Sequence, residues 1–375
     1  MYHHDSRPYA EAVSEAAAKG RVKLEEIIHN GMKSAEQVVE QIQSRQVQDR
    51  IVRTPAIRIQ SEDGQRWDMA AGEFAAPLHD HAFGQVVADA GIGMKFIDHV
   101  RDEAQGCPWG KELVAHTLNT VLANRTKQRN LVRQEGTHVK GFLSDKYRRL
   151  DSRPLLDSFI AAAHKGGLVP VDGKATETKS RVRALLPKVF EPAPGEVVAF
   201  GLEWGNSDYG DGGHVVNLFM LRVWCTNLAV AESCLRHIHL GRRLDDNIEY
   251  SARTLELDTK ANAAALADTV RHAIGPARVA AMLDTIRAAK DDSVGGMDVE
   301  SRLKKLLNKG DVEKVEAIFN GPDVVNVPAG QNAWRLSNAV SWFAQTKGFS
   351  VTKQLELQDV AGKLLPVKAA KPREV

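Results

Sequence analysis

The chain has 375 residues, of which 43% are hydrophobic and 26% are charged, as in ordinary globular proteins and unlike disordered or collagen-like chains. A net charge of +2 excludes a strongly basic protein, so affinity for nucleic acid would have to come from local clusters of Lys and Arg. The three cysteines are too few for a disulfide framework, and neither a signal pattern nor a run of roughly 20 apolar residues is present, so we expect a cytoplasmic protein without membrane contact.

The first half of the chain alternates helical and strand patterns. Apolar residues at helical spacing predict helix over residues 1–50, 83–102 and 110–124. Turn residues at 61–64, between two segments of alternating polarity, predict a β-hairpin. A second hairpin is predicted over 129–143, with its turn at Glu135-Gly136.

The second half begins with strands and continues with helices. A helix is predicted over 153–164, followed by strands over 181–190, 196–204 and 214–224, the last apolar on both faces as in a central strand. From 259 to 350 the pattern is helical, and a terminal strand from Val351 precedes a basic tail. We therefore predict an α+β fold with an antiparallel sheet core, packed helices and a mainly helical C-terminal third, in four segments: 1–50, 51–258, 259–350 and 351–375.

Positive charge concentrates in the predicted β-rich middle. Between Arg125 and Arg153 the chain has nine cations and three carboxylates, an excess of six, whereas the whole chain nets only +2. Cations along a groove neutralise phosphates, and aromatic rings stack on unpaired bases. The candidate nucleic-acid-binding residues are Arg129, Arg133, Lys140, Phe142, Lys146, Tyr147, Arg148, Arg149, Arg181 and Arg183. An equally good interpretation is that the basic residues are ordinary solvated edges of strands.

Motifs for other chemistry are weak. Cys225, Cys234, His237 and His239 lack the spacing of closed zinc sites, and no nucleophile or phosphate-loop pattern is found. Carboxylate and amide oxygens in the glycine-rich segment 205–213 offer ligands for a divalent ion, but glycine-rich hairpin loops carry such residues anyway; they are Asn206, Asp208 and Asp211. We predict no cofactor and no metal, and an enzyme is less expected than a binding protein.

Four stretches carry a resemblance to a known family. They are residues 141–151 (GFLSDKYRRLD), 204–210 (WGNSDYG), 221–227 (LRVWCTN) with Arg236-His237, and Asn332-Ala333-Trp334. The sequence resembles a phage- and plasmid-borne family named only as a domain of unknown function, number 932 in its series, over roughly residues 50–345. The resemblance implies a mobile-element setting and no particular reaction. The order of hairpin, helix and strands is also similar to the core of phage single-strand annealing proteins.

The first functional hypothesis is therefore a protein of a phage, plasmid or prophage that binds nucleic acid, in particular single-stranded DNA, during recombination or replication without catalysis. The alternative is a factor that binds or inhibits a host protein through its helical C-terminal third. Its candidate anchors are Trp334, Trp342 and Phe343, which also suit a helix packed on the sheet. Self-association into a homo-oligomer is compatible with either hypothesis.

Overall fold

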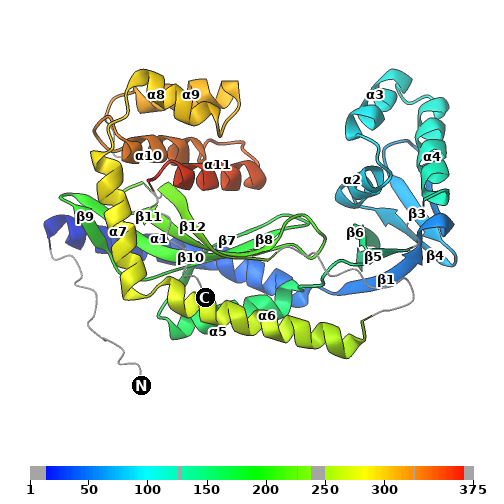
Figure 1. Ribbon diagram of the computed structural model, residues 1–375, viewed down its shortest axis with the longest axis horizontal. Helices are drawn as coiled ribbons and strands as arrows, with labels where there is room; N and C mark the ends of the chain where they lie inside the picture. The colour runs from blue at the N-terminus through cyan, green and yellow to red at the C-terminus, as the bar shows by residue number, and fades with distance from the viewer. Residues whose placement is uncertain (1–13, 126–128, 226, 238–249, 324–325, 367–375) are drawn as a thin grey trace, which may run out of the picture.

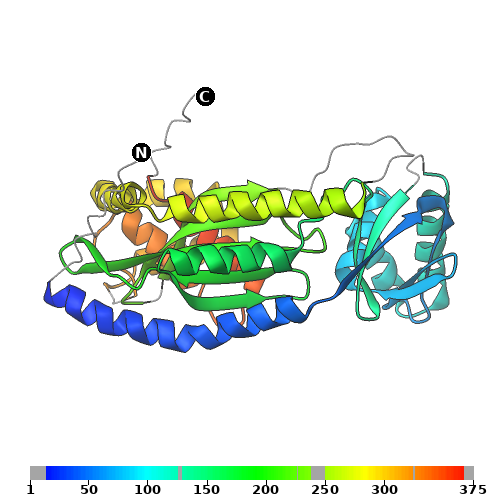
Figure 2. The same cartoon turned by 90° about the horizontal axis from the view of Figure 1, so that it is seen from below.

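A computed structural model describes residues 14–125, 129–225, 227–237, 250–323 and 326–366. Two sheets, each with its own helices, form two lobes joined side by side (Figures 1 and 2). All strand pairs are antiparallel except for one residue pair between β4 and β6. The predicted α+β class, with antiparallel sheets and a helical C-terminal region, is confirmed. None of the described helices has the length and apolar character needed to span a bilayer.

The small lobe contains the first sheet, in the order β1-β5-β6-β4-β3-β2. Its elements are β1 (Val47–Arg53), the 3-10 helix η1 (Thr54–Ala56), β2 (Ile57–Gln60), β3 (Trp67–Ala71), β4 (Phe74–Leu78), α2 (Asp80–Asp89), α3 (Met94–Ala104), α4 (Pro108–Ala123), β5 (Arg129–Glu135) and β6 (His138–Ser144). Ile57 and Ile59 alternate inward along β2, and the Trp67 and Phe83 rings stack 4.9 Å apart beneath the helices. The Asn119 side chain bonds both the N–H and the C=O of Ile59, which caps this sheet edge.

The large lobe contains the second sheet, in the order β12-β11-β10-β8-β7 with β9 beside β10. Its strands are β7 (Val169–Ala175), β8 (Ser180–Leu185), β9 (Phe190–Ala193), β10 (Glu196–Asn206), β11 (His214–Arg222) and β12 (Asn227–His237). Every residue of β10 is buried, because helices cover both faces of the sheet. Val198, Phe200, Leu202 and Trp204 lie on one face with α5 (Ser152–Lys165) and α6 (Ala252–Ala273).

The opposite face of this sheet is shared by α1 (Glu15–Ser44) and the C-terminal helices. α1 runs along β7 so closely that a Cβ on Gly31 would lie 1.6 Å from the Val171 carbonyl oxygen, so only glycine fits there. The apolar residues on this face, including Ala199 and Phe219, pack against α1. Arg181, Arg183 and Glu203 lie on the same face by the two-residue period of strands, but toward the C-terminal helices.

The C-terminal helices stack above this part of the sheet (Figure 1). They are α8 (Gly296–Lys304), α9 (Lys309–Phe319), α10 (Ala333–Phe343) and α11 (Val351–Lys363), and α7 (Pro276–Asp291) leads up to them along the side of the sheet, beside β9. Both α10 and α11 contact β12. In α10 the buried Arg335 donates to the carbonyl oxygens of Phe319, Gly321 and Pro328 and pairs with Asp323, which ties the chain after α9 to α10.

Four predictions about the elements need correction. Residues 351–363 form helix α11 and not a strand, because Ser350 caps the helix by accepting from the Lys353 N–H, and Leu355 and Leu357 are buried. The predicted helix over 83–102 is two helices, separated where Gly91 takes a positive φ of 73°. The predicted core over 51–258 contains two sheets, and the helix predicted for residues 1–50 ends at Ser44, before β1. Residues 367–375 of the predicted tail lie outside the described residues.

Candidate binding site on the second sheet

Arg133, the centre of the predicted basic surface, is 1% exposed and lies inside the molecule. Its Nε donates to Asp49 Oδ1 at 2.8 Å, its Nη2 to Asp151 Oδ1 at 2.6 Å, and its Nη1 to the Asp208 carbonyl oxygen at 2.7 Å. Burial alone would lower the pKa of Arg133, but the three aspartates outweigh it and hold the pKa above its usual range. A phosphate would reach this guanidinium only by displacing its partners.

Most other members of the basic run are also paired with carboxylates. Arg148 forms a two-pronged ion pair with Asp258, with Nε 2.6 Å from Oδ2. The remaining pairs are Arg149 with Asp49 at 2.7 Å, Lys140 with Glu135 at 2.9 Å, and Arg129 with Asp145 at 3.9 Å. Lys146 is half-buried and has no ion pair among the described residues.

The two aromatic residues of the run do not offer free rings. Phe142 is 3% exposed and belongs to the core of the small lobe. Tyr147 is half-buried, and its hydroxyl donates to the Ser207 carbonyl oxygen at 3.2 Å. Burial raises the pKa of the Tyr147 hydroxyl. Base stacking on Phe142 would require its removal from the core.

Arg181 and Arg183 share one carboxylate on the second sheet. The fully buried Glu203 accepts from both arginines, with Arg183 Nη2 at 2.6 Å. Arg183 also bonds Asp172 at 2.8 Å and the Gln358 side chain of α11 at 2.6 Å. Burial would raise the pKa of Glu203, but Arg183 and Arg181 outweigh it and lower that pKa to about 2. Arg183 is thus buried and fully paired, whereas the side chain of Arg181 is partly exposed.

Two of the candidate nucleic-acid-binding residues, Arg133 and Arg183, therefore need correction, because they are not on the surface. Arg133 and Arg183 are buried in separate clusters, one between the lobes and one beneath α11. Their carboxylate partners come from distant parts of the chain, so charge counted along a short segment overstated the free positive charge. Of the two candidate binding residues on the second sheet, only Arg181 keeps a partly exposed side chain.

The glycine-rich loop 205–213 joins β10 to β11 in the large lobe and also contacts the small lobe. Asp208 accepts from Arg45 Nη1 at 3.0 Å and from the Ser152 N–H at 2.7 Å. The Tyr209 carbonyl oxygen bonds Gln85 Nε2 at 2.8 Å, and its hydroxyl donates to Glu135 at 2.6 Å. This loop therefore holds the small lobe through its own polar groups.

The same contacts account for the candidate metal ligands. Asn206 donates to the Leu150 carbonyl oxygen at 2.7 Å, and Asp211 pairs with Lys179 at 2.9 Å. No group of three His, Cys, Asp or Glu side chains in the described parts of the chain is arranged to hold a metal ion. Cys225 is buried and Cys234 half-buried, neither forms a disulfide, and His239 lies outside the described residues.

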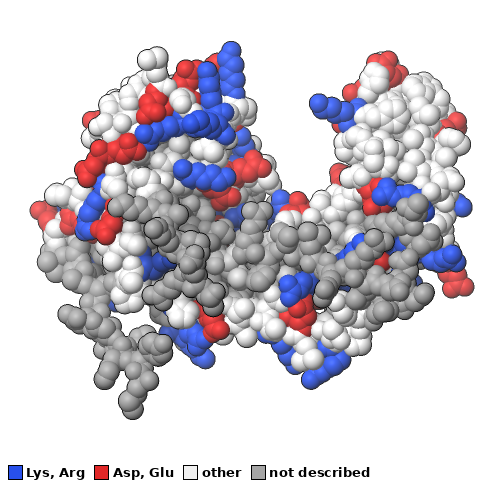
Figure 3. Space-filling model, in the orientation of Figure 1, with Lys and Arg blue, Asp and Glu red and all other residues white. Residues whose placement is uncertain are grey.

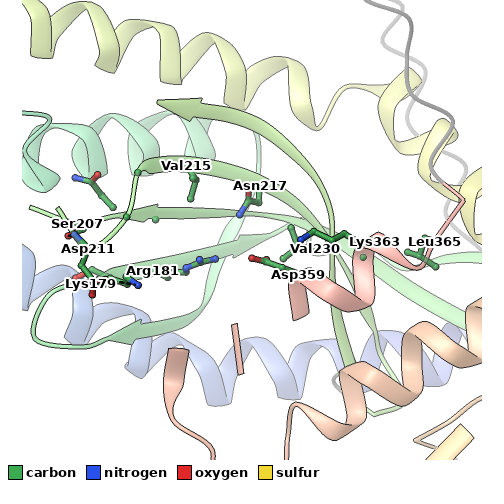
Figure 4. Close-up of a pocket in the computed structure, with 16 residues that line it drawn as sticks. Lys179, Arg181, Ser207, Asp211, Val215, Asn217, Val230, Asp359, Lys363 and Leu365 are labelled. Atoms are coloured by element: carbon green, nitrogen blue, oxygen red, sulfur yellow. Dashed lines mark hydrogen bonds and ion pairs between the residues drawn. The ribbon is translucent and has the colours of Figure 1, made fainter. Parts of the chain in front are cut away.

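A cavity of about 680 Å³ lies on the second sheet between α11 and the glycine-rich loop (Figure 4). β8, β10, β11 and β12 form its floor, and the C-terminal half of α11 forms one wall. Its charged lining residues are Lys179, Arg181, Asp211, Asp359 and Lys363, and its polar ones include Asn206, Ser207 and Asn217. A volume of this size matches a small-molecule site.

Four side chains converge in the middle of this cavity (Figure 4). Arg181 and Asp359 point toward one another from β8 and α11, with Asn217 of β11 and Lys363 of α11 beside them. Beneath them, Glu203 accepts from Arg181 and from Asn217 Nδ2, the latter at 3.3 Å. We call Arg181, Asn217, Asp359 and Lys363 the cavity quartet.

Asp359 is the unusual member of the cavity quartet. Its Oδ1 is buried and has no hydrogen-bond partner among the described residues. Burial raises the pKa of Asp359, with Arg181 opposing and Glu203 reinforcing the shift. A buried carboxylate oxygen without a partner is costly, so it is a position where a proton or a ligand is expected.

Sequence reasoning identified only Arg181 of the cavity quartet, and it named Asn206 and Asp211, which line the same cavity, only as candidate metal ligands. The overlooked signal was a polar residue inside an apolar strand: Asn217 stands between Val216 and Leu218, and Glu203 between Leu202 and Trp204. Buried polar residues of this kind need partners, which points to a polar cluster on one face of the sheet. Asp359 and Lys363 had no such signal, because the segment was expected to start as a strand.

The candidate anchors of the host-protein alternative lie in α10. Trp334 and Phe343 are 2% and 4% exposed, and Trp342 is half-buried. They pack within the large lobe, in agreement with the competing interpretation of a helix packed on the sheet.

Comparison with known proteins returns no matching family model, no matching curated protein and no matching solved structure. The resemblance to the phage- and plasmid-borne family and to annealing proteins thus stays a prediction.

Proposed function

We propose that the protein binds single-stranded nucleic acid and takes one of its nucleotides into the cavity beside α11. The observation that carries the proposal is a cavity of about 680 Å³ lined by three partly exposed cations, Lys179, Arg181 and Lys363, of which Lys179 and Arg181 have an acidic partner and Lys363 has none among the described residues. Cations spaced along a groove neutralise consecutive phosphates. The cavity is too small for a duplex and suits a single nucleotide-sized group.

A route for the rest of the strand lies between the lobes. Ser207 and Asp211 line the cavity, and between them Tyr209 bonds Gln85 of the small lobe, so this end of the cavity lies where the lobes meet. Above this junction the surface has a deep notch (Figure 3). Lys and Arg side chains gather on the notch wall formed by α9 and α11, with fewer on the opposite wall. This distribution supports an electrostatic path for a polyanion.

The cellular setting is part of the proposal and rests on the sequence resemblance. We place the binding activity in the recombination or replication of a phage, plasmid or prophage, in the cytoplasm. Binding without catalysis is sufficient for such a role.

The test is fluorescence anisotropy of a labelled oligothymidylate at increasing salt. Three phosphate contacts predict that log K falls against log salt with a slope of about −2. The double variant Lys179→Gln and Lys363→Gln removes two of the contacts, so both the affinity and the slope should decrease. The matched control is Lys305→Gln with Lys347→Gln, two exposed lysines that do not line the cavity. Affinity that does not respond to salt, or equal losses in the two double variants, would overturn the proposal.

A further inference from the structure

The cavity quartet has unused hydrogen-bonding capacity that faces one point. A guanidinium has five N–H donors, and Arg181 commits Nη1 to Glu203. Asn217 Nδ2 has two hydrogens and makes one long bond, also to Glu203. Lys363 is exposed at the cavity wall and has no ion pair among the described residues.

The charges of the cavity quartet are close but do not touch. Arg181 and Lys363 both act electrostatically on Asp359, yet neither forms an ion pair with it within 4.0 Å among the described contacts. The space between them is part of the cavity, and a small polar group with several acceptor atoms would join all four side chains.

We propose that the cavity quartet binds a phosphomonoester, either the terminal phosphate of a nucleic-acid strand or the phosphate of a free mononucleotide. This inference rests on the proposed function and assigns the chemical group that the cavity selects. The donors reach the site from three elements, β8, β11 and α11. A phosphomonoester has three free oxygens to accept from them, whereas an internal diester has two and must leave the site in two directions.

Asp359 joins this site as the neutral acid when the phosphate is bound. The charged groups that face it are Arg181 and Arg183 of β8, Glu203 of β10 and Lys363 of α11. Burial, the main cause, raises the pKa of Asp359 despite the cations. An incoming phosphate raises that pKa further, because its negative charge favours the neutral acid. The O–H of Asp359 then donates to a phosphate oxygen, and Oδ1 gains the contact that it lacks.

The experiment compares strands that differ only at their ends. Oligothymidylates of roughly ten nucleotides carry a 5′-phosphate, a 3′-phosphate or no terminal phosphate, with the fluorescent label always on the other end. One of the two phosphorylated strands should bind the full-length protein about tenfold more tightly than the unphosphorylated strand. Thymidine 5′- and 3′-monophosphates and inorganic phosphate, added as competitors, distinguish a strand end from a free nucleotide. Equal dissociation constants for all three strands, without competition by either mononucleotide, would refute the site.

Variants assign the effect to the cavity quartet. Lys363→Gln should abolish the preference for a terminal phosphate, whereas Lys347→Gln should retain it. Asp359→Asn keeps a hydrogen-bond donor but cannot ionise, so the wild-type protein should lose affinity for the phosphorylated strand relative to this variant as the pH rises. The ratio of the two dissociation constants cancels the titration of the phosphate itself, whose second pKa is about 6. A ratio that does not change with pH would refute the role of Asp359.

The outcomes separate this inference from the proposed function. Salt-dependent strand binding without preference for a terminal phosphate would leave the proposed function standing and overturn the phosphomonoester site. Binding of mononucleotide without binding of any strand would do the reverse.

Discussion

At the scale of single residues, Arg133 was predicted to bind phosphate because of its charge, but its contacts give it a structural role. It is buried between Asp49, Asp151 and the Asp208 carbonyl, so its role is to join β1, β5, the segment before α5 and the glycine-rich loop. Removal of one partner from a buried ion-pair cluster leaves the others desolvated and uncompensated, which is more costly than the loss of a surface charge.

Arg133→Met is therefore expected to lower the free energy of unfolding by about 3 to 5 kcal/mol. Urea denaturation followed by circular dichroism measures the change. Arg153→Met, at an exposed position outside such a cluster, serves as the control and should change the free energy by less than about 0.5 kcal/mol. If Arg133→Met retained stability but lost oligonucleotide affinity, the original expectation of a phosphate contact at this residue would be restored.

At the scale of elements, α11 forms one wall of the cavity, so the distance between this helix and the sheet determines the shape of the cavity. The helix approaches β12 so closely that a Cβ on Gly362 would lie 1.6 Å from the Val230 carbonyl oxygen. Asp359 and Lys363 flank this contact, and Gln358 bonds Arg183 across the same interface. The position of the cavity quartet thus depends on one glycine.

Gly362→Ala is expected to push α11 away from β12, to lower the free energy of unfolding by about 1 to 3 kcal/mol and to weaken oligonucleotide binding. Gly84→Ala in α2 is the control, because no heavy atom lies within 4 Å of its added Cβ and alanine favours helix there. Urea titration and anisotropy on both variants give the comparison. Unchanged affinity in a folded Gly362→Ala variant would show that the spacing of α11 does not matter for binding.

The sequence predicted elements whose signals are local and missed those that depend on partners. The hairpin at Glu135-Gly136, α5 and the strands around β10 were predicted because turn residues and periodicity lie within each segment. The strand predicted from Val351 was wrong because a short apolar alternation in a helix was interpreted without its Ser350 cap. The site was largely missed, since no local pattern indicates that Asp49, Asp208 and Glu203 neutralise arginines far away in the sequence.

At the scale of the whole molecule, the two lobes contact each other through the glycine-rich loop, which also borders the cavity. Gln85 of α2 is central to this junction, since it donates to the Tyr209 carbonyl oxygen and accepts from the Phe142 N–H at 2.7 Å. A ligand held near Ser207 and Asp211 would therefore act on the same short segment that positions the small lobe.

Gln85→Ala is expected to speed amide hydrogen exchange in the loop 207–211 and in β6, and to cost about 1 kcal/mol of stability, because one hydrogen bond across the junction and one within the small lobe are lost. Exchange measured by mass spectrometry reports both segments. Gln41→Ala, at an exposed position on α1, is the control. Exchange in Gln85→Ala that equals that of wild type would mean that the remaining contacts hold the junction without Gln85, among them His81, 3.1 Å from the Tyr209 carbonyl oxygen, and the bond from the Tyr209 hydroxyl to Glu135.

The packing of α1 on β7 has a consequence for the order of folding. The helix is made first, but the strand that buries it follows only after the whole small lobe. During synthesis all strands of the small lobe are therefore made before α1 can pack on β7. The contact between α1 and β7 closes a long stretch of chain, so we expect it to form slowly and late. The apolar face of α1 therefore stays exposed on the nascent chain until β7 has been made.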